Sequence, residues 1–143
     1  MSVIRNPLLS TDADKYAKAI DGNFYHYHDE KMTWVDAQHA CSSEVRGARL
    51  PILVEEESWK AVQGRKRVWI GGSDAEHEGI WKWIYGDGIK KEITGTIPWF
   101  ENEPDGGSKE NYMILCGHNL AELCDVVKQR HFEFFCQLSA KGD

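Results

Sequence analysis

The chain has 143 residues, with 17 basic and 23 acidic side chains and a formal net charge of −6. This length suits one domain with its own buried core, and we expect a single domain over residues 1–143. The acidic balance and the scarcity of clustered lysine and arginine exclude a nucleic-acid binder. No apolar run approaches the ~20 residues of a membrane-spanning helix, so we expect no membrane insertion.

The first dozen residues show no regular pattern, which predicts a short N-terminal arm. Residues 22–28 then alternate apolar and polar side chains and are rich in aromatics, which predicts a strand.

Two helices are predicted next. Thr33 is placed to cap the first helix, Asp36 stands at its third position, and its apolar face comprises Trp34, Ala37, Ala40 and Cys41. The second helix is predicted from Val54 to Gln63, because its acidic start suits the positive end of a helix dipole. Trp59 and Val62 would form its inner face.

The second half of the chain predicts strands. Short apolar or alternating runs mark residues 68–72, 79–86, 112–115 and 132–136, and their tryptophans Trp69, Trp81 and Trp83 are expected in the core. Residues 87–107 are rich in turn residues with little periodicity, and so long an irregular segment is usually functional. Helices followed by an antiparallel sheet predict an α+β fold.

Four cysteines are present, an even number without CxxC spacing or flanking histidine pairs: Cys41, Cys116, Cys124 and Cys136. This pattern favours disulfides over a zinc site, and disulfides favour an oxidising compartment. Spacing alone leaves three pairings open, and four reduced, buried thiols in a cytosolic protein are the alternative.

The order of these features resembles the C-type lectin-like domain. The resemblance rests on the helix with Cys41, the runs WIGG (69–72) and GIWKW (79–83), Trp99, the triplet Glu103-Pro104-Asp105, the pair Glu110-Asn111, and Cys136 in the last strand. It covers residues 22–138. It implies two helices, a small antiparallel sheet and a long irregular ligand-binding loop.

The resemblance implies a disulfide from Cys41 on the first helix to Cys136 on the last strand. The family's usual second bridge would fall at Tyr112 and Lys128, neither of which is a cysteine. Cys116 and Cys124 instead flank a turn, and we expect a relocated bridge across that turn. Two free thiols are the alternative.

The resemblance also implies a calcium-dependent sugar site. The family's site uses acidic or amide residues on both sides of a cis-proline, a following glutamate, and an Asn-Asp pair on the next strand. The corresponding residues here are Glu103 and Asp105 around Pro104, then Glu110 and Asp125. Such carboxylates suit calcium, which takes six to eight oxygen ligands. An acidic surface turn is the alternative.

The sequence departs from the family at two points in this site. Cys124 stands where the family has an asparagine ligand, and sulfur is a poor ligand for calcium. The triplet is a hybrid of Glu-Pro-Asn, which the family pairs with mannose-type sugars, and Gln-Pro-Asp, which it pairs with galactose-type sugars. Residues 106–109 lack the aromatic platform of galactose readers, which favours mannose- or glucose-type ligands.

An accessory cation site corresponds by resemblance to Asp74 and Glu78, completed by Glu110 and Asn111. One of its ligands is missing, because Gly106 stands at that position. A polar loop before a strand is the alternative.

We therefore expect an extracellular or secreted calcium-dependent lectin that binds glycans or glycoproteins, although this chain shows no apolar signal core. Several copies would be needed for avidity, because a single sugar site binds weakly. The alternative is a calcium-independent receptor or adhesion module that binds a protein. No GxSxG elbow or acid–base pair indicates an enzyme.

His26 and His28 share one face of the first predicted strand. Two imidazoles at this spacing could bind a metal, but no HExxH motif accompanies them, and a solvated face is the preferred interpretation.

Overall fold

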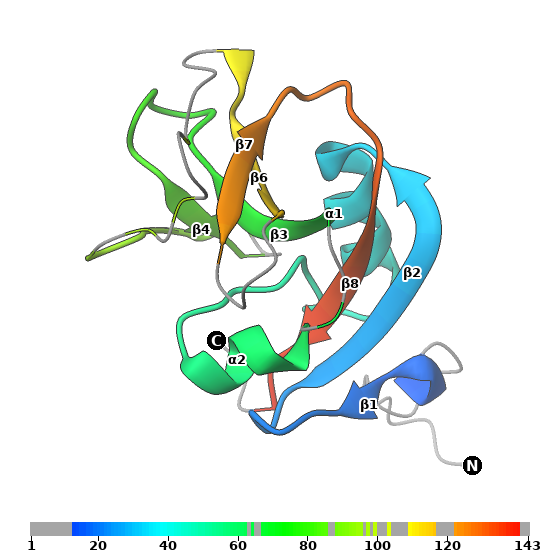
Figure 1. Ribbon diagram of the computed structural model, residues 1–143. Helices are drawn as coiled ribbons and strands as arrows, with labels where there is room; N and C mark the ends of the chain where they lie inside the picture. Colours follow the sequence, from blue (N-terminus) through cyan, green and yellow to red (C-terminus); the bar gives the residue numbers. More distant parts are fainter. Residues whose placement is uncertain are drawn as a thin grey trace.

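The computed structural model describes residues 13–62, 64, 67–85, 88–95, 97, 99, 103, 109–116 and 122–140 (Figure 1). The predicted N-terminal arm, residues 1–12, therefore lies outside the described residues. Within those ranges the chain has a 3-10 turn (Ala13–Lys15) and two α-helices, α1 (Trp34–Glu44) and α2 (Glu56–Ala61). It has eight strands there: β1 (Ala17–Lys18), β2 (Phe24–Met32), β3 (Val68–Ser73), β4 (Lys82–Ile84), β5 (Lys90–Glu92), β6 (Tyr112–Leu115), β7 (Leu123–Val126) and β8 (Phe132–Leu138). This content confirms the predicted α+β class.

Strand β8 occupies the centre of the sheet. The strand order is β1-β2-β8-β3-β4-β5, and β6 pairs with β3 and β7. Every pairing of these named strands is antiparallel except that of β3 with β8. The expectation of a wholly antiparallel sheet is corrected at this pair. Parallel neighbours need a long crossover, and four strands separate β3 from β8 along the chain.

Helix α1 begins where the sequence predicts. The side chain of Thr33 accepts a hydrogen bond from the Asp36 N–H at 3.2 Å, which satisfies one of the free donors of the first turn. Cys41 is fully buried on the inner face and forms a disulfide with Cys136 of β8, 95 residues away. In the chain-entropy model a loop of this length contributes about 4–5 kcal/mol.

Helix α2 is shorter than the predicted range from Val54 to Gln63. Val54 is 66% exposed, and Glu55 is an extended N-cap without a side-chain capping bond. Val62 is fully buried as expected, although it lies just beyond the helix as its C-cap. Gln63 lies outside the described residues. Neither helix in the described part of the chain is long and apolar enough to span a membrane.

Strand β3 is buried at every position, which explains its uninterrupted apolar run. The Gly71 N–H donates to the Pro51 carbonyl at 2.8 Å. A Cβ at Gly71 would lie 2.9 Å from Ile52 Cδ1 and 3.0 Å from the Leu50 and Pro51 carbonyl oxygens. Glycine is therefore needed here, because the backbone of residues 50–52 packs directly on the strand.

The three predicted core tryptophans are buried, with Trp69 at 0%, Trp81 at 6% and Trp83 at 5% exposure. Of the strand predicted over residues 79–86, the described residues include only β4, because Gly79 takes a turn conformation with φ of 85°, and residue 86 lies outside the described residues. Two strands, β1 and β5, have no counterpart in the sequence analysis, whereas β7 is the strand on which the resemblance placed Asp125. Strand β5 has the sequence Lys-Lys-Glu and is exposed throughout, so it carries no apolar pattern to detect.

One carboxylate ties the β1–β2 connection to α2. Asp21 accepts hydrogen bonds from the Ser58 hydroxyl and the Asn23 N–H, both at 2.9 Å, and from the Tyr25 hydroxyl. Burial opposes ionisation of Asp21, but these hydrogen bonds outweigh it and hold its pKa below the ordinary value of 3.8. Asp21 therefore stabilises the fold in its charged form.

We expect Asp21→Asn to lower the free energy of unfolding by about 1–3 kcal/mol at neutral pH. Because the folded-state pKa is depressed, the wild-type advantage is fully present above pH 3.8 and is lost as the pH falls through the lower folded value. Urea unfolding of the wild type and the variant across this pH range measures the difference in free energy of unfolding. Asp29→Asn, at an exposed position of β2, is the matched control. A difference that stays constant down to acidic pH would contradict the assignment.

Candidate functional site

Asp74 follows β3 directly and is only 2% exposed. Its Oδ2 accepts a hydrogen bond from the Gly79 N–H at 2.8 Å, and its own N–H donates to the Asn111 carbonyl at 3.1 Å. The Ser73 hydroxyl donates to the same carbonyl at 2.9 Å. These bonds hold the loop after β3 against the residue that precedes β6.

Asp125 on β7 is 3% exposed and lies opposite Met113 of β6. Its N–H donates to Glu103 Oε1 at 3.2 Å. The structure therefore brings the half-buried Glu103 carboxylate, which is 22 residues earlier in the chain, onto β7. Pro104, Asp105 and Gly106 lie outside the described residues.

The charges of this region are mutually unfavourable. Burial raises the pKa of Asp74, and the nearby Asp125 charge raises it further against the Gly79 hydrogen bond. Desolvation, and then the charge of Asp74, raise the pKa of the exposed Glu78. Asp74 Oδ1 is buried and has no hydrogen-bond partner among the described residues. A divalent cation would relieve both the repulsion and the unsatisfied oxygen.

Four of the predicted ligand residues are connected to one another. Contacts or charge interactions join Asp74, Glu78, Asp125 and Glu103, and the Asn111 backbone holds Asp74. Glu110 is half-buried, next to Asn111 and just before β6. We define the acidic group as Asp74, Glu78, Glu103, Glu110 and Asp125.

Cys124 stands beside Asp125 on β7 and forms a disulfide with Cys116. Both disulfides expected from the sequence are therefore present, and no described cysteine is free. A sulfur committed to a disulfide offers no thiolate to a cation. Metal ligands at this edge must come from the oxygen-bearing side chains.

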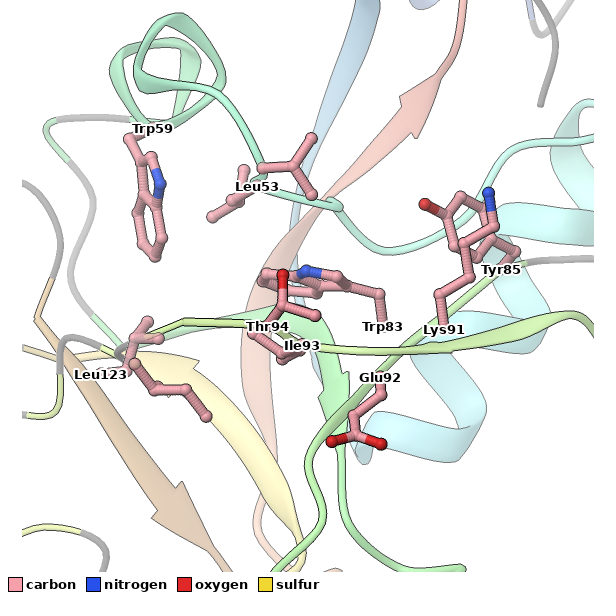
Figure 2. A pocket seen from close by; sticks show the side chains of 11 residues that line it. Leu53, Trp59, Trp83, Tyr85, Lys91, Glu92, Ile93, Thr94 and Leu123 are labelled. Carbon is pink, nitrogen blue, oxygen red and sulfur yellow. The ribbon is translucent and has the colours of Figure 1, made fainter.

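Sequence reasoning missed an aromatic groove of about 450 Å³ between α2, β4, β5 and β7. Figure 2 shows Trp59 and Trp83 facing the same space as Leu53, Ile93 and Leu123. The alternation of Trp81, Trp83 and Tyr85 was the available signal, because it places Trp83 and Tyr85 on one side of the chain. Trp59 lies on α2, and the sequence pattern does not show that α2 packs beside β4.

The expectation of a solvated face for His26 and His28 was wrong. Their side chains are 19% and 18% exposed, and both lie against Glu44 of α1. Strand alternation correctly placed the two imidazoles together, but it carried no information about the helix that covers them.

A family model described as the lectin C-type domain matches residues 30–138. Over 143 residues the chain is 32% identical to mouse C-type lectin domain family 4 member F, in a match that covers 94% of this chain. The chain spans only 25% of that relative's length.

Two solved structures show the same fold. The trimeric structure of Kupffer cell C-type lectin receptor Clec4f has a TM-score of 0.71 and 25% identity, covering 92% of this chain and 87% of that chain. A calcium-independent type II antifreeze protein has a TM-score of 0.72 and 19% identity, covering 87% of this chain and 92% of that chain.

Replacing the buried carboxylate of Asp74 tests whether the acidic group binds a cation. With chelator, we expect Asp74→Asn to raise the free energy of unfolding by about 1–3 kcal/mol, because an amide removes the repulsion and still accepts from Gly79. With excess calcium, the variant should lose this advantage. Urea unfolding in both conditions measures the two values, with Asp29→Asn as the exposed control. Equal effects with and without calcium would contradict a cation at Asp74.

Proposed function

Because the chain belongs to the C-type lectin domain family, we propose that it binds carbohydrate through a calcium ion held by Glu103, Asp105, Glu110 and Asp125. The hydrogen bond from the Asp125 N–H to Glu103 is the observation that carries the proposal. It brings the loop carboxylate of Glu103 against the backbone of Asp125, whose own carboxylate we assign to the same ion.

The donor set fits calcium and not a softer metal. The acidic group supplies carboxylate oxygens, which hard cations prefer, and the neighbouring sulfurs are committed to a disulfide. Calcium bound there would coordinate two neighbouring hydroxyl oxygens of a sugar. The protein's part is to accept hydrogen bonds from those hydroxyls through the carboxylates that also hold the ion.

We assign Asp74, Glu78, Glu110 and Asn111 to an accessory calcium site in the same proposal. The buried, unsatisfied Oδ1 of Asp74 supports this assignment, as does the exposed Glu78 beside it. An ion there would fix the loop after β3 against the segment before β6. It would thereby stabilise the neighbouring sugar site.

The proposed ligands are mannose- or glucose-type sugars of glycans and glycoproteins. Residues 106–109 contain no aromatic side chain on which a galactose face could stack. The proposed setting is extracellular, because the two disulfides need an oxidising compartment. Assembly of several copies would supply avidity.

A calcium-independent protein-binding module is the second candidate function. The Cys116–Cys124 disulfide favours it, because a sulfur stands where the family has an asparagine ligand. The aromatic groove is a further surface that such a module could use, since the half-buried Trp59 and the buried Trp83 line it without any role for calcium.

Thermal unfolding with excess calcium and with chelator separates the two candidates. Calcium at a hundred times its dissociation constant should add about 2.7 kcal/mol, which raises the midpoint by several degrees in a domain of this size. Retention on immobilised mannose should then require calcium. An unchanged midpoint would contradict the lectin proposal and favour the protein-binding module.

The double substitution Glu103→Gln with Asp105→Asn tests the site itself. We expect it to abolish calcium-dependent mannose retention and to leave the fold intact, because amides are weaker ligands of similar shape. Glu30→Gln, at an exposed position of β2, is the matched control and should retain full binding. Full calcium-dependent sugar binding by the double variant would contradict the assigned ligands.

A further inference from the structure

Three side chains from two elements converge at a place that the sugar-binding proposal does not use. His26 Nδ1 lies 3.0 Å from Glu44 Oε1, and His28 Nε2 lies 3.2 Å from the same oxygen. The three donor atoms all lie within 4.8 Å of one another. We propose that His26, His28 and Glu44 form a binding site for a zinc ion, separate from the acidic group.

The chemistry of the donors favours a transition metal such as zinc over calcium. Two imidazole nitrogens and one carboxylate oxygen are ligands that zinc accepts, whereas calcium takes oxygen ligands almost exclusively. Three protein ligands leave the fourth tetrahedral position for water or another molecule.

Two of the three ligand separations are close to those around a tetrahedral ion. Zinc with ligands at about 2.0–2.1 Å separates two ligand atoms by about 3.3–3.4 Å, the edge of the tetrahedron. The observed separations of 3.0 and 3.2 Å between Glu44 and the two histidines are close to this edge. For these two edges, movements of a few tenths of an ångström suffice to admit the ion, and the two imidazole nitrogens lie within 4.8 Å of each other.

The fold holds these ligands in place. His26 and His28 alternate onto one face of β2, where His26 is the register partner of Cys136 and His28 that of Phe134. The His28 ring stacks on Phe134 with centroids 4.6 Å apart. Cys136 is bonded to Cys41, one turn before Glu44 on α1, so the disulfide fixes Glu44 over the two imidazoles.

A hydroxyl group orients the carboxylate from outside the ligand set. Tyr16 donates a hydrogen bond to Glu44 Oε1 at 2.8 Å. Such outer contacts fix ligand orientation in metal sites. The side chains of His26, His28 and Glu44 are 19%, 18% and 12% exposed, so the group is sheltered and still open to an entering ion.

Calorimetric titration with zinc alone tests the site, in a non-coordinating buffer that contains excess calcium to fill the oxygen sites. We expect one zinc ion per chain. His26→Gln with His28→Gln should weaken zinc binding by more than about tenfold, since the loss of even outer contacts costs that much. Glu44→Gln, which keeps an acceptor for Tyr16, should also weaken it.

His39→Gln is the control, because His39 is an exposed histidine on the same helix as Glu44. It should bind zinc as the wild type does, and all variants should keep the wild-type calcium response. Absence of zinc binding, or equal binding by the wild type and the two ligand variants, would overturn the proposal and leave a hydrogen-bonded group only. Neither result bears on the calcium-dependent sugar site.

Discussion

The disulfide between Cys41 and Cys136 joins the first helix to the central strand of the sheet, and the rest of the structure is built outward from that connection. The next residue, Gln137, is 1% exposed and binds the Ile52 backbone through both ends of its amide, with bonds of 3.0 and 3.2 Å. Strand β8 thereby fixes α1 and also the segment that packs against Gly71 of β3. A single strand sets the positions of helix, sheet and connecting chain.

The acidic group depends on this framework. Strand β3 pairs with β8 and ends directly before Asp74, while β6 and β7 extend the sheet to Asp125. Burying these carboxylates near one another costs free energy, as the raised pKa of Asp74 indicates. The covalently tied core can tolerate that cost, and a bound cation would offset it. The arrangement is typical of a site in which local stability is given up for binding.

Local chemistry explains which predictions the sequence allowed. The Thr33 cap depends on neighbours a few residues away, and the buried tryptophans depend on a strong apolar pattern. Strand β5 was not predicted, because its exposed lysines and glutamate have no apolar pattern. The contact of His26 with Glu44 was not predicted for another reason. It depends on a helix and a strand meeting across a disulfide, and periodicity describes one element at a time.

The central claim is that Glu103 and Asp125 share a calcium ion that also contacts a sugar. A crystal structure grown with calcium and mannose tests it most directly. The account predicts anomalous density about 2.3–2.6 Å from carboxylate oxygens of both residues, with two sugar hydroxyls completing the ion's coordination. Crystals with mannose bound elsewhere, or with no calcium at these carboxylates, would contradict it.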